Sequence, residues 1–171
     1  MKKYNIMITS TGGDLSPFLI NYLKTQSIHK NLNIVATDFR ENALGKYFAD
    51  HFETVPHGNS NKYIIKIIYL IKKYKINLII PTSDEEALNL TKNRKKIETN
   101  GTILACTNYE NLKVFSSKAK TYEKVSEIGF NVAEWFEVKD RIKFFKIFNY
   151  FIKKKKNFVI KPSSKSEESS A

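Results

Sequence analysis

Two lysines are placed where they could neutralise a phosphate group. Lys161 ends the apolar run Phe158-Val159-Ile160 and precedes Pro162, whereas Lys118 follows Ser117 at the expected start of a helix. The chain between them is long enough for a helix and a strand–helix–strand unit. If both ammonium groups met one anion, they would act as point charges on a triphosphate chain.

The alternative is that these are ordinary surface lysines of a lysine-rich chain. The apolar strand expected before Lys161 argues against that interpretation at this one position. The run Lys153–Lys156 is ambiguous in the same way, because it could grip phosphate or simply end a helix. The helix dipole favours cations at a C-terminus, and we favour this second interpretation of the run.

A glycine turn near the start of the chain is another candidate for phosphate binding. Thr11, Gly12 and Gly13 follow an apolar strand and precede a helix, so their N–H groups could cradle a phosphate. The spacing does not match G-x-G-x-x-G, and a tight turn that needs positive φ explains it equally. Asp38 ends the next strand, where a dinucleotide fold places its ribose-binding acid; alternatively it caps the next segment or pairs with Arg40.

Polar and acidic residues follow the apolar run at 78–81. Thr82, Asp84, Glu85 and Glu86 are expected at the C-terminal edge of a central parallel strand, where ligand sites form. The acids there could orient a cationic group. They are equally typical of a helix start, since Ser83 or Asp84 can cap the helix and the dipole favours acids in its first turn.

The sequence shows no metal-ligand cluster and no pairing of a nucleophile with a base. His29, His51 and His57 are isolated from one another, and Cys106 is the single cysteine. Cys106 is expected to be a small buried hydrophobe. We therefore predict no metal site and no catalytic residue in this chain.

The composition indicates a folded protein of the cytoplasm. Hydrophobic residues make up 42% of the 171 residues, which is enough for a core. The formal charge is +12, but lysine supplies nearly all of the positive charge and base readout relies on arginine, which disfavours a nucleic-acid partner. We expect no signal peptide and no membrane association, and a single cysteine fits a reducing compartment.

Short apolar runs alternate with helical patterns over roughly the first 115 residues. Strands are expected at 4–9, 32–38, 53–55, 78–81 and 102–106. Helices are expected from Ser16 as N-cap, at 61–74, from Leu88 to Ile97, at 109–115 and at 118–128. This alternation predicts an α/β fold, a Rossmann-like parallel sheet with helices on both faces.

The character of the sequence changes after Gly129. A strand is expected at Val132–Val138, a helix capped by Asp140 at Arg141–Lys153, and a final buried strand at Phe158–Lys161.

With these motifs the chain resembles the N-terminal part of ATP-grasp enzymes, particularly the carbamoyl-phosphate-synthase large-subunit-like and carboxylate–amine ligase branches. The matching segments are Ile8–Gly13, Thr37-Asp38, Ile80–Glu86, Ser117–Tyr122 and Phe158–Pro162. The resemblance implies a pre-ATP-grasp domain at residues 1–115, with a linking helix and an incomplete start of an ATP-grasp domain at 116–171. It also implies that Lys118 and Lys161 are ATP-binding lysines.

Enzymes of this family, by resemblance, use ATP and Mg²⁺ to activate a small carboxylate as an acyl-phosphate, which an amine or thiol then attacks. ATP and a small carboxylate are thus the implied partners. The chain departs from the family after Pro162, because Ser163–Ser170 contains no glycine and its two glutamates would repel phosphate. The family's Mg²⁺-binding acid and asparagine are absent as well, so we expect the chain alone not to turn over ATP.

Two other classes of function fit parts of the sequence. A nucleotide- or dinucleotide-binding Rossmann module would use the Gly12-Gly13 turn and Asp38, and it predicts tight NAD binding. A non-catalytic interaction domain would use an exposed apolar face and predicts a homo-oligomer. That face comprises Phe144, Phe145, Phe148 and Phe151.

Overall fold

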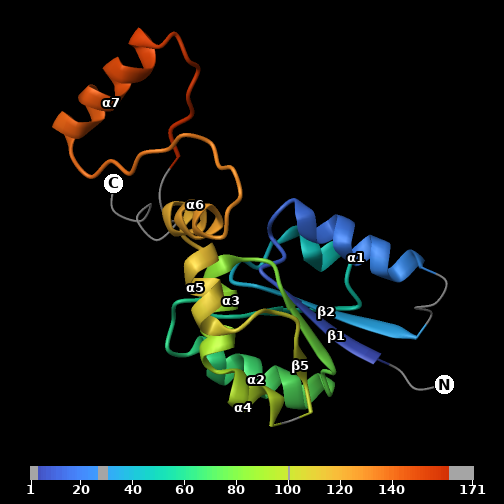
Figure 1. Cartoon of the computed structure of the whole chain (residues 1–171). Coiled ribbons are helices and arrows are strands. Elements are labelled where there is room, and N and C mark those ends of the chain that lie inside the picture. Colours follow the sequence, from blue (N-terminus) through green and yellow to red (C-terminus); the bar gives the residue numbers. More distant parts are fainter. Residues whose placement is uncertain (1–3, 27–30, 100, 162–171) are drawn as a thin grey trace. The chain divides into compact units, whose positions relative to one another are not determined.

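A computed structural model describes residues 4–26, 31–99 and 101–161, and it divides the chain into two compact units (Figure 1). The first unit is Met1–Leu112 and the second is Lys113–Ala171. The helix α5 (Tyr109–Phe115) contains the boundary between them.

Five parallel strands form the sheet of the first unit, in the order β3-β2-β1-β4-β5. They are β1 (Tyr4–Thr9), β2 (Leu32–Asp38), β3 (His51–Thr54), β4 (Leu78–Pro81) and β5 (Ile103–Leu104). A central first strand with connections leading outward on both sides is the topology of a Rossmann-like sheet. The predicted fold class is confirmed.

One face of the sheet carries the larger of two hydrophobic layers. The helices over it are α2 (Tyr63–Tyr74), α3 (Asp84–Lys92) and α4 (Arg94–Glu98). Their inward side chains pack on Met7 of β1 and Ile79 of β4, both of which are fully buried. Burial of each such side chain contributes about 1.5–3 kcal/mol, so this layer fixes the helices to the sheet.

The opposite face is covered by α1 (Leu15–Thr25). Ile20 of this helix packs with Ile8 and Ile34 of the sheet, and all three side chains are fully buried. Successive residues of a strand face opposite sides, which explains why Met7 and Ile8 belong to different layers.

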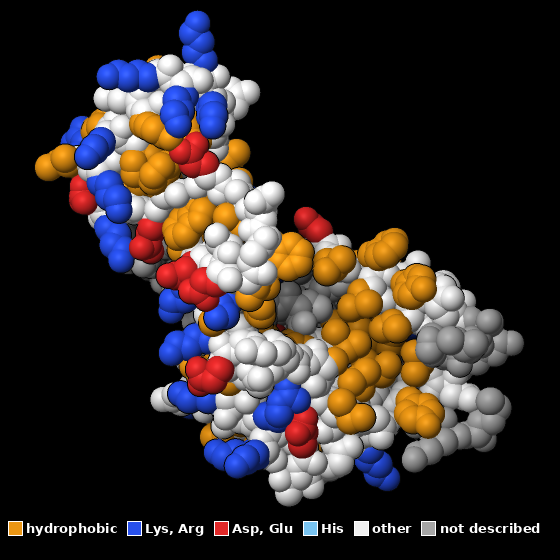
Figure 2. Space-filling view, viewed as in Figure 1, with side chains coloured by type: hydrophobic (Ala, Val, Ile, Leu, Met, Phe, Trp, Pro, Cys, Tyr) orange, Lys and Arg blue, Asp and Glu red, His pale blue; other side chains and the backbone are white. Residues whose placement is uncertain are grey.

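Part of this second face is not covered by the described residues of the first unit. Ile103 of β5 is 64% exposed and its register partner Leu78 is only partly buried. On α1 itself Phe18 is 71% exposed. Figure 2 shows hydrophobic side chains gathered on the side of this unit where α1 lies.

Two helix boundaries of the first unit differ from the prediction. Ser16 is not an N-cap, because α1 begins one residue earlier and Ser16 is buried inside its first turn. The helix predicted to run through Ile97 is broken at Asn93, whose side chain donates hydrogen bonds to the backbone and side chain of Asn89.

The helices of the second unit match the predicted ones. They are α6 (Lys118–Glu127) and α7 (Arg141–Lys153), and the side chains of Ser117 and Asp140 cap them. Gly129 adopts φ 87°, a left-handed conformation that favours glycine after a helix. None of the helices in the described ranges combines the length and hydropathy of a transmembrane segment.

The two strands predicted in the second unit are wrong. Val132–Val138 and Phe158–Lys161 belong to no helix or strand, and Val159 is 78% exposed. A strand needs a hydrogen-bonded neighbour, and neither segment pairs with another among the described residues. Both segments have the apolar residues that are typical of a strand. They do not form one, because no neighbouring strand pairs with them among the described residues.

An aromatic cluster replaces a sheet core in the second unit. Phe158 packs on α7, with ring centroids 5.6 Å from Phe148 and 5.3 Å from Phe151, while Phe136 contacts Phe151 at 5.9 Å. The stripe on α7 is thus partly covered by its own unit, although Phe145 stays 48% exposed.

Candidate functional site

Three central strands end at one edge of the sheet in the first unit. Thr9, the last residue of β1, is paired with Pro81 at the end of β4, and β2 ends beside them at Asp38. Ligands of open α/β sheets bind at this edge. The carboxyl-edge site, as defined here, comprises Ser10–Gly13, Asp38–Arg40 and Thr82–Glu86.

Asp38 is a structural clamp within this site. Its side chain is fully buried, and its Oδ2 accepts a 2.6 Å hydrogen bond from the Gly12 N–H. Its Oδ1 accepts hydrogen bonds from the backbone N–H of Arg40 at 2.9 Å and from the Arg40 Nε at 3.3 Å. The predicted alternative of a pair with Arg40 is therefore what the structure contains, and both carboxylate oxygens already have protein partners.

The tight-turn interpretation expected positive φ at the glycines, and this expectation is wrong. A glycine is needed here because other side chains approach the backbone closely. The positive φ of this loop is at Ser10, at 58°, and neither Gly12 nor Gly13 has one. A Cβ on Gly12 would lie 2.0 Å from Arg40 Nη2 and 2.9 Å from Asp38 Oδ2. Gly12 therefore makes room for the Asp38–Arg40 pair, whereas Gly13 faces open space.

Thr11 joins the loop after β1 to the end of β2 and to the segment around Gly45, and it is completely buried. Its N–H and its Oγ1 both donate to the Thr37 carbonyl, at 3.0 and 3.1 Å. Its own carbonyl accepts from the Gly45 N–H at 2.9 Å. A Cβ on Gly45 would lie 2.3 Å from the Thr11 Cβ, so these two segments are in direct contact. Thr11 thus supports the loop from inside.

Thr82 joins the end of β4 to the end of β1. Its Oγ1 donates to the Thr9 carbonyl at 2.6 Å and lies 3.1 Å from the Ser10 carbonyl. The buried Ser16 Oγ lies 3.5 Å from the same oxygen. Thr82 therefore joins the loop after β1 to the segment that leads into α3.

The acidic residues after Thr82 divide between the surface and the interior. Ser83 caps α3 by accepting from the Glu86 N–H, so the helix-start interpretation is correct for this serine. Asp84 is exposed. Glu85 lies 3.5 Å from His57 Nε2, and this pairing shows that His57 is not isolated in the fold.

Glu86 is the one of the three acids that turns inward, whereas the sequence placed it beside Asp84 and Glu85 as a surface acid or helix start. Its side chain is only 4% exposed, and a Cβ on Gly58 would lie 2.8 Å from its Cγ. The signal was present in the sequence, because Glu86 stands one helical turn before the core residue Leu90 and on the same face.

Burial is the main cause of an unusual pKa at Glu86, which it raises to about 7. The carboxylates of Asp38 and Glu85 also raise this pKa, whereas the nearby hydroxyls of Thr9 and Tyr63 lower it. These two hydroxyls approach the carboxyl without reaching full hydrogen-bond geometry. Among the described residues, Glu86 Oε2, Tyr63 Oη and Thr9 Oγ1 are buried without a hydrogen-bond partner.

The predicted ATP-binding lysines belong to the second unit. Lys118 occupies the first position of α6, as expected, and Lys161 is exposed beyond α7 instead of ending a buried strand. Pro162 and the serine- and glutamate-containing segment after it lie outside the described residues. The structure thus places both lysines in one unit and the carboxyl-edge site in the other.

Two lysines of the run at the end of α7 form ion pairs. Lys154 and Lys156 lie 3.8 and 3.3 Å from the carboxylate of Glu134. A hydrogen bond from Tyr150, reinforced by these lysines, lowers the pKa of Glu134. The contacts support the interpretation of the run as a charged helix end.

Within residues 4–26, 31–99 and 101–161 there is no group of three or more His, Cys, Asp or Glu side chains that could hold a metal ion. The ring of His51 lies 5.1 Å from that of Tyr74 at a tilt of 39°, and His29 lies outside the described residues. Cys106 is only partly buried, against the expectation, and it packs on the edge of the larger hydrophobic layer.

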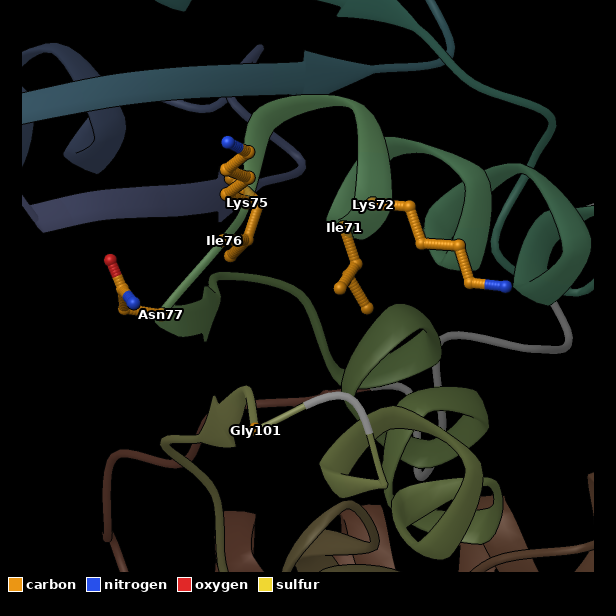
Figure 3. Close-up of a pocket in the computed structure, with 6 residues that line it drawn as sticks. All are labelled: Ile71, Lys72, Lys75, Ile76, Asn77 and Gly101. Atoms are coloured by element: carbon orange, nitrogen blue, oxygen red, sulfur yellow. The ribbon is translucent and has the colours of Figure 1, made fainter.

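A hollow of about 340 Å³ lies away from the carboxyl-edge site, beside the beginnings of β4 and β5. Figure 3 shows that the side chains of Lys72 and Lys75, which line it, point to different sides. Ile71 points toward the segment bearing Gly101. Because the two ammonium groups do not converge, Lys72 and Lys75 cannot bind one anion together in this hollow.

Solved structures share this fold. An N5-carboxyaminoimidazole synthetase from Staphylococcus aureus in complex with ADP superposes with a TM-score of 0.61 at 16% identity, covering 86% of this chain and 36% of its own. The N5-carboxyaminoimidazole ribonucleotide synthetase from Thermotoga maritima gives 0.56 at 16% identity, with coverages of 85% and 36%. The biotin carboxylase domain of a single-chain bacterial carboxylase gives 0.56 at 10%, with 88% and 35%.

At these identities the likeness shows the fold alone, and the chain spans about a third of the length of these solved relatives. No curated protein matches the chain. A model of the PylC-like, N-terminal domain family matches residues 6–105, which include β1 from Ile6 onward, the other four strands and the whole carboxyl-edge site. The chain therefore belongs to the PylC-like N-terminal domain family.

Proposed function

We propose that the chain is the N-terminal portion of an ATP-dependent ligase, in which a small carboxylate is activated as an acyl-phosphate and attacked by an amine or thiol. The observation that carries this proposal is the family match over residues 6–105. The fold shared with a synthetase that is complexed with ADP supports it. The reaction would need the remainder of such an enzyme, so the chain alone is expected not to turn over ATP.

The proposal divides the chain into two tasks. Residues 1–115 would act as the pre-ATP-grasp domain, with the substrate at the carboxyl-edge site, and residues 116–171 would begin the nucleotide-binding part. The geometry limits which residues of the site could contact the substrate. The polar atoms of Thr11, Asp38 and Thr82 are already engaged in internal hydrogen bonds. Gly13 and Asp84 are exposed and remain free to meet a ligand, and Glu85 is partly exposed beside them.

The chemistry proposed for the lysines is neutralisation of phosphate charge. Lys118 and Lys161 would contact the ATP phosphates and stabilise the charge that develops during phosphoryl transfer. Mg²⁺ would supply further positive charge in a complete enzyme. The described residues contain no ligand set for it, so no step of the reaction is assigned to a metal in this part of the chain.

The test compares two lysines in a complete ligase that carries this chain as its N-terminal portion. Lys161→Ala is expected to lower ADP formation about 100-fold or more, the usual loss when a charge-stabilising group is removed. Lys154→Ala is the matched control, because this lysine is paired with Glu134 and should change the rate less than about twofold. Equal losses for the two variants would contradict the role given to Lys161.

The dinucleotide alternative is weakened by the clamp at Asp38. A ribose hydroxyl could bind this carboxylate only by displacing the Gly12 and Arg40 hydrogen bonds. We expect no NAD binding in a calorimetric titration of the purified chain. Tight binding that Asp38→Ala abolishes would reverse the ranking of the two functions.

The interaction-domain alternative rests on exposed apolar surface. It would be favoured by a stable oligomer on a sizing column that disperses when the most exposed ring of α7, Phe145, is replaced by serine. A monodisperse monomer would count against it.

A further inference from the structure

The interior end of the carboxyl-edge site holds a group of buried polar atoms that the proposed ligase chemistry does not use. Glu86 from α3, Tyr63 from α2 and Thr9 from β1 converge there, with Tyr63 and Thr9 fully buried. An oxygen of each of the three lacks a hydrogen-bond partner among the described residues. Buried polar groups are nearly always hydrogen-bonded, so an unpaired cluster of this kind calls for a physical explanation.

A tight backbone turn closes over the Glu86 side chain. The Gly58 backbone is so close that any Cβ there would approach the Glu86 Cγ to 2.8 Å. Asn89, also on α3, donates a 2.6 Å hydrogen bond to the Gly58 carbonyl. His57 in the same turn faces Glu85 at 3.5 Å. The turn and the start of α3 therefore enclose Glu86 together.

Two opposing effects decide whether Glu86 carries a charge. Its place in the first turn of α3 weakly favours an anion through the helix dipole. The cost of burying an unpaired carboxylate is the larger effect, because the charge loses its hydration without gaining a partner. The charged groups around it add to the penalty, because Asp38 and Glu85 are carboxylates and the titratable Tyr63 is neutral at ordinary pH. Arg40 is directed to Asp38.

We propose that the enclosed Glu86 carboxyl is a proton-operated switch, which keeps the start of α3 closed on Thr9 and Tyr63 when protonated and loosens it when ionised. A protonated carboxyl can donate to a neighbouring hydroxyl oxygen and so satisfy part of the buried cluster. An ionised carboxyl gains like-charge repulsion from Asp38 and must draw in water. The segment that moves carries Asp84 and Glu85, so proton uptake controls the shape of the carboxyl-edge site, whatever ligand binds there.

The sign and size of the effect follow from linkage. The pKa of Glu86 is about 7 in the closed state and 4.5 for an ordinary glutamate, so the closed state binds the proton more tightly. The stabilisation is complete below about pH 4.5 and is lost as the pH rises through about 7. Between pH 6 and pH 8 the population of the open state should rise roughly tenfold.

Hydrogen exchange of the full chain at pH 6 and pH 8, corrected for intrinsic exchange, measures this opening. Amides of residues 83–92, which comprise the N-cap Ser83 and α3, should lose about tenfold protection at pH 8. The loss should be smaller across β4 and the end of α2. Glu86→Gln, which stays neutral at both pH values, should remove the pH response. Retention of the full response in Glu86→Gln, or an equal loss throughout the unit, would overturn the proposal.

Two controls separate Glu86 from its titratable neighbours. Glu85→Gln removes an adjacent carboxylate that is partly exposed, and His57→Gln removes the side chain whose type ordinarily titrates in this pH range. Both variants should keep most of the response, and its loss in either would assign the switch to that residue.

If Glu86→Gln does not fold, the wild-type carboxyl can be observed directly. In a chain with ¹³C-labelled glutamate, one carboxyl resonance should titrate with a midpoint near 7 and should persist in Glu85→Gln. If no glutamate carboxyl titrates above the ordinary 4.5, the switch is disproved.

Discussion

The two units of this chain bury their apolar residues to very different degrees. In the first unit, two hydrophobic layers enclose the sheet and contain fully buried side chains such as Met7, Ile8 and Ile79. In the second unit every described residue is at least partly exposed, although α7 carries a long aromatic stripe. Similar proportions of apolar residues therefore produce a closed core in one unit and an open cluster of rings in the other.

The difference shows what a sheet contributes. Each parallel strand satisfies its neighbours' backbone groups and presents side chains to both faces, so one helix layer on each side completes a core. The second unit has helices with well-formed caps but no paired strands among its described residues. Its rings can only pack on one another and on the segment that includes Phe158.

The largest contrast is expected between two isoleucines on helices. Ile67 of α2 is fully buried, whereas Ile142 of α7 is 85% exposed. Ile67→Ala should lower the free energy of unfolding of the first unit by about 2–5 kcal/mol through lost burial and a cavity. Ile142→Ala should change that of the second unit by less than about 0.5 kcal/mol. Hydrogen exchange in β1 measures unfolding of the first unit, and fluorescence of the single tryptophan, Trp135, measures unfolding of the second. Equal losses of stability in the two variants would contradict the comparison.

An intermediate contrast is expected between two aspartates that hold backbone N–H groups. Asp38→Ala leaves the Gly12 amide and the Arg40 pair without their buried acceptor and should cost about 1–3 kcal/mol. Asp140→Ala removes an exposed N-cap bond to the Lys143 amide and should cost about 1 kcal/mol or less. Denaturant midpoints measured with the same two probes test the order, and the reverse order would show that the clamp at Asp38 is dispensable.

The smallest contrast concerns two carboxylates that are each paired with lysines. Burial alone would raise the pKa of Glu53, but hydrogen bonds from Lys73, Tyr74 and Lys66 lower it to about 2. Its contribution is therefore present above about pH 4.5 and is lost as the pH falls through about 2. Glu53→Gln should flatten the acid side of the stability curve of the first unit by about 1 kcal/mol or less.

Glu134→Gln is the matched variant in the second unit. The pKa of Glu134 is also lowered, with Tyr150 as the main cause, but this carboxylate is more exposed. Its removal should change acid stability less than Glu53→Gln does. A larger change would mean that the ion pairs at the end of α7 hold the second unit together.

Local signals in the sequence were sufficient for much of the fold. Serine and aspartate before a helix identified the caps at Ser83 and Asp140, because each bond spans only three residues. Apolar runs bounded by turn residues identified the central strands. The same kind of run at Phe158–Lys161 gave a wrong strand, since pairing depends on a partner that a local pattern does not contain.

The candidate site shows the same limit. The sequence predicted that Gly12, Asp38 and Thr82 would meet at the strand ends, because parallel strands share one edge. It did not predict that the Gly12 amide would be occupied by Asp38, or that Glu86 would turn inward to residues as distant as Thr9. Such contacts depend on how layers pack, which periodicity alone does not determine.

Transfer of an oxygen isotope from the carboxylate to phosphate can show whether an acyl-phosphate forms. A complete ligase containing this chain would be given ATP, an amine or thiol, and a panel of small carboxylates labelled with ¹⁸O. If an acyl-phosphate forms, its carbon–oxygen bond breaks on attack, and one carboxylate oxygen leaves with the released phosphate. We expect one ¹⁸O atom in each phosphate formed with the true substrate. Phosphate that remains unlabelled while ligation proceeds would contradict it.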